Sequence, residues 1–237
     1  MDEWRYKSAG DFGMPMQHRL KSVRRESGLV SSLTSQAWWM STTAYLRVYH
    51  RLSIRGQEHL PAKPPFIMIA NHTSHLDILQ LAAALPMRLR DCAYPIAAGD
   101  TFFETRVRRM FSWMMLGALP MWRKKSVRHA IEDLRNRMLE EPVVYLLFPE
   151  GTRTRTGEIG HFKPGLGMLV AGTDIPVVPC RLSGGFESMP PGAKIPRPRK
   201  LRVTIGEPRQ YDSIVNERQG WNSIVSELEQ VLKGIET

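Results

Sequence analysis

A histidine and an aspartate stand five positions apart in the segment NHTSHLD, residues 71–77. The segment follows a short apolar run, residues 65–70, that fits a buried strand. Because His72 precedes the expected start of a helix, the chain turns after it, and Asp77 can point back toward the imidazole. A carboxylate that holds one ring nitrogen stabilises the imidazolium, so that the other nitrogen can accept a proton near neutral pH. The spacing therefore indicates a general base, although an isolated pair of this kind also describes a helix cap with solvated histidines.

A second polar cluster, FPEGTR at residues 148–153, follows the strongest strand pattern of the chain, residues 143–148. α/β proteins place their sites in loops at the carboxyl ends of strands. Gly151 allows close approach of the backbone, and Arg153 offers a fork that suits a phosphate. Glu150 could orient that arginine or bind a substrate hydroxyl. Taken by itself, the cluster also fits an ordinary turn with a surface ion pair.

Two apolar segments carry further candidates. Residues 110–122 contain no charge, and Arg123 directly follows them, within a heptapeptide that begins at Gly117. An arginine there would lie where an apolar environment meets a polar one. The alternative is a core helix with a basic last turn, which the helix dipole favours. Residues 175–180, IPVVPC, form either a core strand or the lining of an apolar groove.

Other chemistries lack their sequence signatures. The G-x-S-x-G elbow of serine nucleophiles is absent, and so is the G-x-x-x-x-G-K-[ST] phosphate loop. His75 lies near His72 and Asp77, but no second ligand cluster completes a metal site. The two cysteines, Cys92 and Cys180, give no disulfide framework, which fits a reducing compartment.

Apolar runs and amphipathic segments alternate along the chain. Strands are expected at residues 65–70, 93–98, 143–148, 175–180 and 201–206, the last as an edge strand. Helices are expected at residues 78–85, capped by Thr73 or Ser74, and at 126–140, 165–172 and 221–235, and a helical pattern runs through 102–122. Strands that alternate with helices predict an α/β fold, with a mixed, largely parallel central sheet flanked by helices.

The amino-terminal part has a different character. Residues 1–27 are polar and basic and predict a flexible arm, whereas residues 28–50 repeat apolar side chains at helical steps. Aromatic rings that suit a headgroup boundary accompany them: Trp38, Trp39, Tyr45 and Tyr49. The formal net charge of +10 implies an anionic partner. Because no apolar stretch reaches the roughly 20 residues that span a bilayer, we expect an amphipathic membrane-docking helix at 28–50; a helix packed on the core is the alternative.

Taken together and in this order, the four segments resemble the motifs of the glycerolipid acyltransferase family, whose type member is 1-acylglycerol-3-phosphate acyltransferase. The first family motif, N-H-x-S-x-x-D, matches residues 71–77, and F-P-E-G-T-R matches residues 148–153 without a change. The resemblance covers roughly residues 50–210. Each motif alone is of limited specificity, but four in order make chance agreement remote.

The remaining motifs complete the resemblance. The pattern that ends in an arginine matches Gly117, Leu119, Pro120, Met121 and Arg123. The apolar motif with two prolines matches residues 175–179, with Pro176 and Pro179 in their places. Lys163 and Gly165 look like the K-x-G that often follows the third motif.

The resemblance implies a reaction and a set of site residues. His72, oriented by Asp77 in the H-x-x-x-x-D motif, would act as general base on an acceptor hydroxyl that attacks an acyl thioester directly. The residues implied to bind the acceptor phosphate are Arg123, Glu150, Gly151, Thr152, Arg153 and Lys163. Those implied to line an acyl groove or to serve a structural role are Gly117, Pro120, Pro176 and Pro179.

The resemblance also implies substrates and a location. The acceptor would be the free hydroxyl of 1-acyl-glycerol-3-phosphate, which yields phosphatidic acid in phospholipid biosynthesis. The donor would be acyl-CoA or acyl-ACP, with no bound cofactor and no metal. Residues 51–237 would form the acyltransferase domain, peripheral or monotopic at the cytoplasmic face of a membrane. The expected partners are an anionic phospholipid surface, the lysophospholipid acceptor and the donor, with no nucleic acid.

Two alternatives stay open. The same reaction could use another lysolipid, such as lyso-ornithine lipid or another lysophospholipid, because the motifs specify only a polar head. In a different class, the charge also fits a non-catalytic basic protein that binds membranes or nucleic acid. The intact pair of His72 and Asp77 argues against an inactive relative. Basic residues that flank apolar runs, instead of following one polar helix, argue against nucleic acid.

Overall fold

The computed structural model describes residues 29–98, 119–121 and 127–236. The expected arm at residues 1–27 lies outside the described residues, as do Gly117, Arg123 and the greater part of the uncharged run at 110–122. The chain divides into two compact units, Met1–Met40 and Ser41–Thr237. The described part of the first unit is helical and belongs to α2 (Leu29–Val48). The second unit contains the sheet and every predicted site residue that the structure describes.

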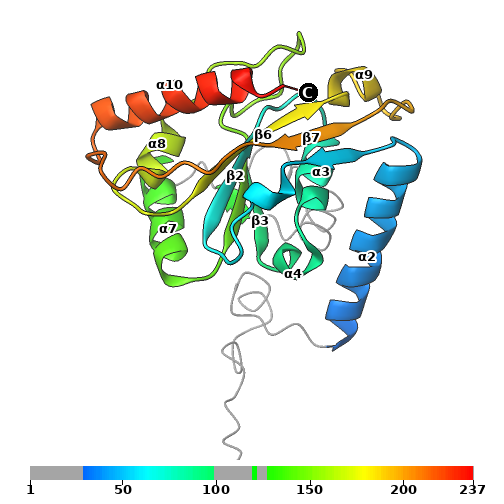
Figure 1. The fold of residues 1–237 in the computed structure, drawn as a ribbon, viewed down its shortest axis with the longest axis horizontal. Coiled ribbons are helices and arrows are strands. Elements are labelled where there is room, and N and C mark those ends of the chain that lie inside the picture. The colour runs from blue at the N-terminus through cyan, green and yellow to red at the C-terminus, as the bar shows by residue number, and fades with distance from the viewer. Residues whose placement is uncertain (1–28, 99–118, 122–126, 237) are drawn as a thin grey trace, which may run out of the picture. The chain divides into compact units, whose positions relative to one another are not determined.

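The second unit is built on a seven-stranded sheet with the order β1-β7-β6-β2-β5-β3-β4 (Figure 1). The strands are β1 (Ser53–Arg55), β2 (Phe66–Ala70), β3 (Ala93–Ala98), β4 (Leu119–Met121), β5 (Val144–Leu147), β6 (Val177–Ser183) and β7 (Arg202–Ile205). All neighbouring strands are parallel except β6 and β7, which are antiparallel. Every residue of β2 is buried, because this strand is central and covered on both faces.

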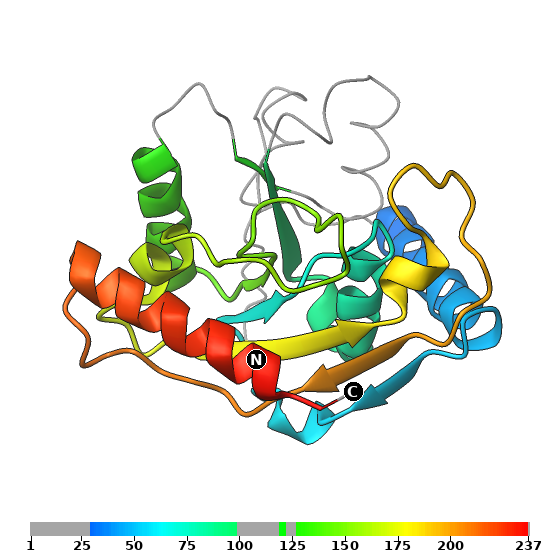
Figure 2. The same cartoon turned by 90° about the horizontal axis from the view of Figure 1, so that it is seen from above.

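Helices cover both faces of the sheet (Figures 1 and 2). On one face α3 contacts β5, β6 and β7, and on the other α10 contacts β6 and α8, which packs against α7. The helices are α3 (Asp77–Ala84), α4 (Met87–Arg90), α7 (Val127–Glu140), α8 (Gly165–Val170), α9 (Gly185–Ser188) and α10 (Arg218–Gly234), with a 3-10 turn, η1 (Gln57–His59). The predicted α/β fold with a mixed, largely parallel sheet is confirmed.

The structure corrects two strand predictions. The strand predicted at residues 201–206 exists as β7, but it is not an edge, because β1 pairs with it on its outer side. β1 and β4 have three residues each, which is too short for an alternating pattern to be recognised. β4 therefore stands at Leu119–Met121, where the sequence indicated the continuation of a helix.

The predicted N-cap of α3 is also wrong. The helix begins at Asp77, and Leu76 occupies the cap position without a side-chain cap bond. Ser74 acts one turn earlier, since its Oγ accepts a hydrogen bond from the Leu76 N–H at 3.0 Å. A serine that bonds the backbone two residues on favours a turn over a helix. The chain therefore makes an extra turn between His72 and the helix.

Pro179 lies inside a central strand, where proline is unusual. Its carbonyl accepts the Gly206 N–H at 2.8 Å, and Gly206 directly follows the end of β7. Since the nitrogen and carbonyl of a strand residue face the same side, the missing N–H of Pro179 faces Gly206, beyond the last residue of β7. The proline therefore removes no hydrogen bond to a residue of β7 itself.

Strand direction brings the two polar motifs to one edge of the sheet. β2 and β5 are parallel neighbours, with Ile69 opposite Leu147. Residues 71–77 and 148–153 follow these strands, so both motifs leave from neighbouring carboxyl ends. β6 is also parallel to β2, and its carboxyl end lies at the same edge.

Candidate active site

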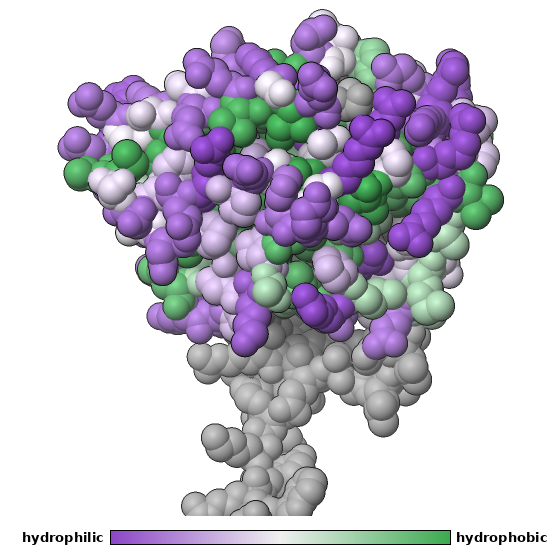
Figure 3. All heavy atoms as spheres, viewed as in Figure 1, coloured by the Kyte–Doolittle hydropathy of each residue, from purple (hydrophilic) through white to green (hydrophobic). Residues whose placement is uncertain are grey.

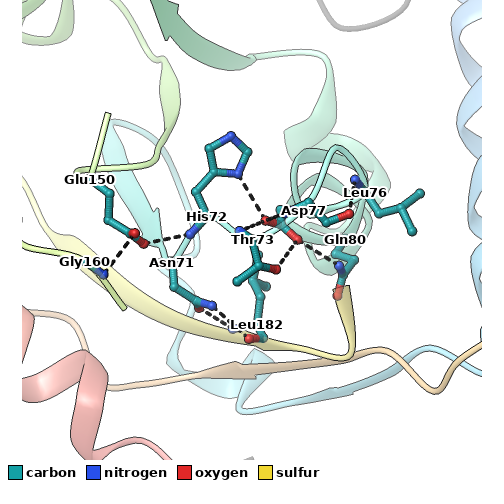
Figure 4. Close-up of polar contacts among 10 residues, drawn as sticks. Asn71, His72, Thr73, Leu76, Asp77, Gln80, Glu150, Gly160 and Leu182 are labelled. Atoms are coloured by element: carbon teal, nitrogen blue, oxygen red, sulfur yellow. Dashed lines mark hydrogen bonds and ion pairs between the residues drawn. The ribbon is translucent and has the colours of Figure 1, made fainter. Parts of the chain in front are cut away.

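His72 and Asp77 form the predicted pair (Figure 4). The imidazole Nδ1 lies 3.1 Å from Oδ2 of Asp77, and the two side chains are 17% and 0% exposed. Nε2 points away from the carboxylate in Figure 4 and has no hydrogen-bond partner among the described residues. The carboxylate therefore holds one ring nitrogen, and the second can meet a substrate.

The Asp77 carboxylate is anchored by the turn that precedes α3. Oδ2 accepts the N–H groups of Thr73 and Ser74, the latter at 2.7 Å. Oδ1 accepts the side-chain amide of Gln80 at 3.3 Å and the hydroxyl of Thr73 at 3.4 Å. A buried carboxylate needs hydrogen-bond donors of this kind to replace its lost hydration. The turn before α3 thus supplies two main-chain donors to the carboxylate.

Gly185 closes the other side of this carboxylate. It is the first residue of α9, separated by one residue from the end of β6, and a Cβ on it would lie 2.6 Å from Oδ1 of Asp77 and 2.9 Å from Oγ1 of Thr73. No larger residue fits there without moving the network. Sequence reasoning missed both Gly185 and Gln80. For Gln80 a signal existed, because three positions after Asp77 is the same face of a helix.

The loop after β5 holds His72 by its ring and by its main chain. The ring stacks on Phe148 with centroids 4.1 Å apart and planes inclined by 16°. The His72 N–H donates to Oε1 of Glu150 at 2.8 Å, and the His72 carbonyl accepts the Thr154 N–H at 2.9 Å. Residues 148–154 therefore position the histidine at three points.

Glu150 lies behind the histidine and is 6% exposed. Its second oxygen, Oε2, accepts the Gly160 N–H at 3.0 Å. Burial raises the pKa of Glu150, while the hydrogen bonds from His72 and Gly160 oppose that rise. Both oxygens bind main-chain donors, so the side chain joins the turn at His72 to the loop at Gly160 (Figure 4).

The last three residues of the FPEGTR cluster face solvent. Gly151, Thr152 and Arg153 are exposed, and Gly151 has a φ of +72°. Lys163, which is also exposed, lies across Gly151: a Cβ there would come within 2.5 Å of its Nζ. The Lys163 N–H binds the Pro149 carbonyl at 2.9 Å. One loop therefore carries two exposed cations, Arg153 and Lys163, as an anion site requires.

Asn71 fastens the start of the turn to β6. Its amide nitrogen donates to the Leu182 carbonyl at 3.0 Å, and its amide oxygen accepts the Leu182 N–H at 2.8 Å. Both atoms are buried. The side chain thus forms the hydrogen bonds that one more strand residue would have formed, while the main chain is already turning.

Arg181 of β6 was not singled out from the sequence. Its Nη1 is buried and makes no hydrogen bond within the described part of the chain. Burial lowers the pKa of Arg181, whereas the charges of Glu158 and Glu150 raise it. No motif signalled this arginine, because its neighbours in space come from a loop more than twenty residues away.

The predicted prolines belong to the sheet or adjoin it. Pro120 lies in β4 opposite Ala97, and Pro179 lies in β6 opposite Ile69. Pro176 directly precedes β6, and its carbonyl accepts the Ile67 N–H at 2.9 Å. Among residues 29–98, 119–121 and 127–236 no three His, Cys, Asp or Glu side chains group as metal ligands. In the same residues no helix is long and apolar enough to cross a membrane.

The fold agrees with the comparisons. The family model "Acyltransferase" matches residues 51–183, which is more than half of the chain. The chain belongs to the acyltransferase family.

Three similar proteins are named for one reaction. The 1-acyl-sn-glycerol-3-phosphate acyltransferase BAT2 of Brassica napus is 30% identical over 176 residues, 72% of this chain and 48% of its own length. The human 1-acyl-sn-glycerol-3-phosphate acyltransferase alpha is 29% identical over 135 residues, 56% of this chain and 46% of its own length. The chain therefore spans about half the length of these relatives. The crystal structure of the acyltransferase PlsC from Thermotoga maritima has a TM-score of 0.59 at 24% identity and covers 86% of this chain and 81% of its own, which shows a shared fold.

Proposed function

We propose that the protein transfers a fatty acyl chain from acyl-CoA or acyl-ACP to the free hydroxyl of 1-acyl-glycerol-3-phosphate, so that phosphatidic acid forms. The membership of the acyltransferase family supports acyl transfer, and the names of the relatives support this acceptor. The observation that carries the proposal is the geometry of His72. One ring nitrogen binds a buried carboxylate, and the ring and main chain are held from the opposite side.

The reaction follows from that geometry. Nε2 of His72 takes the proton of the acceptor hydroxyl while the oxygen attacks the thioester carbonyl, and Asp77 stabilises the imidazolium that forms. The tetrahedral intermediate collapses with cleavage of the carbon–sulfur bond. The leaving thiolate takes the proton from His72, which restores the base. No covalent acyl-enzyme is needed.

The acceptor phosphate has candidate ligands on the exposed side of the same loop. Arg153 and Lys163 are cations there, and Gly151 and Thr152 are exposed and directly precede Arg153 in the loop. We assign the phosphate to these residues together with Arg123. For Glu150 we propose a positioning role, because its oxygens are bound to main-chain donors and a carboxylate repels a phosphate.

We place the enzyme at a membrane surface, peripheral or monotopic and at the cytoplasmic face. Its acceptor is a lipid, and its net charge of +10 favours anionic phospholipid. The segment 28–50 remains a proposed docking element, and so does the uncharged run at 110–122.

Acyl transfer to lysophosphatidic acid tests the proposal. Wild type and His72→Ala are compared with radiolabelled acyl-CoA and with acyl-ACP as donors, and His75→Ala serves as the matched control because its ring is exposed three positions away. Loss of the base should lower the rate about 10²–10⁴-fold, whereas His75→Ala should retain it. Transfer that is unaffected by His72→Ala would overturn the mechanism.

A panel of lysolipids separates the acceptors. The residues that carry the chemistry bind a polar head and do not specify the rest of the lipid. A strong preference for a phosphate-free acceptor, such as lyso-ornithine lipid, would remove the phosphate site from Arg153 and Lys163. Absence of transfer to any acceptor, with the protein folded and lipid present, would favour a non-catalytic membrane-binding protein.

A further inference from the structure

Two stretches of the chain lack acidic residues and lie side by side. Residues 41–57 contain three arginines, and residues 188–206 contain five arginines and lysines, with no Asp or Glu in either stretch. β1 and β7 pair within them, with Ser53 opposite Arg202. The fold therefore brings two basic stretches that are far apart in sequence together in one basic surface.

Among the described residues of the second unit, the two most exposed large apolar side chains lie on this surface. Val48, in the last turn of α2, is 81% exposed, and Ile195, in the loop before β7, is 78% exposed. Exposed cations accompany them: Arg47, Arg51, Lys194, Arg197, Arg199 and Lys200. In Figure 3 strongly hydrophilic side chains gather on the right, over β7 and the end of α2, with hydrophobic ones between them. We call this set of residues the basic apolar surface.

Side-chain contacts hold the segments of the basic apolar surface together. Tyr49 donates its hydroxyl to the Pro196 carbonyl at 3.2 Å, and its ring stacks on Tyr45 with centroids 5.3 Å apart. His50 lies beneath with its Nδ1 3.3 Å from the Arg199 carbonyl. The end of α2 and the loop before β7 are thus joined by side-chain contacts, and Val48 and Ile195 are next to two of the joined residues, Tyr49 and Pro196.

The basic apolar surface lies at the same edge of the sheet as His72. β6 ends at this edge beside β2, and β7, which is antiparallel to β6, begins there. Between β6 and the loop stand two glycines: Gly184 approaches the Lys200 carbonyl, and Gly185 approaches the Asp77 carboxylate. A partner on the basic apolar surface would therefore face the edge that carries the proposed base.

We propose that the basic apolar surface binds an anionic phospholipid bilayer, with Val48 and Ile195 among the headgroups, and that it turns the His72 edge toward the membrane. Cations around exposed apolar tips fit an anionic lipid surface, where each basic residue and each inserted side chain contributes to binding. Nucleic acid would need the cations but would leave both apolar tips in water. The choice of a lipid partner rests on the proposed function.

Vesicle co-sedimentation of the full chain tests the surface without any acyl transfer. The probes are phosphatidylcholine vesicles with and without phosphatidylglycerol. Wild type should bind the anionic vesicles and lose binding at high salt. The double variant Lys194→Gln with Arg197→Gln should bind at least about tenfold more weakly. Arg209→Gln with Arg218→Gln, two exposed arginines outside the surface, should bind as wild type does.

The apolar tips are tested in the same way. Val48→Ser with Ile195→Ser should weaken binding several-fold, while Leu139→Ser with Val215→Ser, two exposed apolar residues elsewhere, should not. Equal binding by all four double variants would overturn the proposal, and so would preference for a DNA duplex over anionic vesicles. A protein that binds through this surface but transfers no acyl group would refute only the proposed reaction.

Discussion

Two buried carboxylates hold His72 from opposite sides, and they act on different parts of it. Asp77 binds the ring at Nδ1 and is itself bonded to the turn before α3. Glu150 binds the main-chain N–H of His72 and the N–H of Gly160. The first interaction governs the proton that the ring exchanges, while the second governs where the ring stands. The difference separates chemistry from placement within one site.

The comparison predicts the largest effect at Asp77. Asp77→Asn keeps the shape of the side chain but removes the charge that stabilises the imidazolium, so we expect kcat to fall about 10³–10⁴-fold, as in other carboxylate–histidine pairs. The KM for both substrates should change little. Steady-state kinetics check this, once Asp77→Asn is shown to be as stable as wild type. Retention of more than about a tenth of kcat would contradict the proposed role of Asp77.

A smaller effect is expected at Glu150. Glu150→Gln keeps one acceptor oxygen but replaces the other by an amide nitrogen, which cannot accept the second main-chain N–H. The turn at His72 should shift, and a displacement of about 1 Å costs up to about 10²-fold in rate. Since the ring and Asp77 are intact, the pH dependence of kcat should keep its midpoint. A changed midpoint would mean that Glu150 also acts on the proton.

Gly185→Ala is expected to reduce stability more than it reduces chemistry. The new methyl group would meet Oδ1 of Asp77, and overpacking of this kind costs about 1–3 kcal/mol. Gly234→Ala is the matched control, because nothing lies within 4 Å of a Cβ at that position. Urea unfolding should show the loss in the first variant alone. Equal stability of the two variants would show that the network yields without cost.

The smallest effect concerns the pH dependence of stability. Burial raises the pKa of Glu150 above its ordinary value of 4.5, so the folded protein holds this proton more tightly than the unfolded chain does. Its contribution to the free energy of unfolding is therefore present below pH 4.5 and is lost as the pH rises through the folded pKa. Urea unfolding at mildly acidic pH should show this decrease in wild type and not in Glu150→Gln.

The sequence was informative where the signal is local. Strand β5 was predicted from a continuous apolar run, and the pairing of His72 with Asp77 from five positions of spacing. The role of Glu150 could not be read in this way, because its partner His72 is 78 positions distant. From the sequence FPEGTR alone, Glu150 could equally well pair with Arg153. Only the parallel pairing of β2 and β5 brings Glu150 next to the main chain of His72.

Short strands and close contacts between distant residues could not be predicted from the sequence either, again for physical reasons. β1 and β4 contain three residues each, and such strands exist because neighbouring strands accept them, not because of their own pattern. Gly185 is one of two adjacent glycines, and nothing in the sequence tells which of them meets the Asp77 carboxylate. Arg181 became notable only when its buried nitrogen proved to lack a hydrogen bond within the described residues.

The side-chain amide of Asn71 has a consequence for motion. Through its two bonds to Leu182, the sheet's hydrogen bonding continues one step beyond the strand that carries it. The amide proton of Leu182 should therefore exchange with solvent as slowly as those of the central strands, although its acceptor is a side chain. The turn that carries His72 lies outside the sheet, but we expect it to unfold locally only when the sheet itself does.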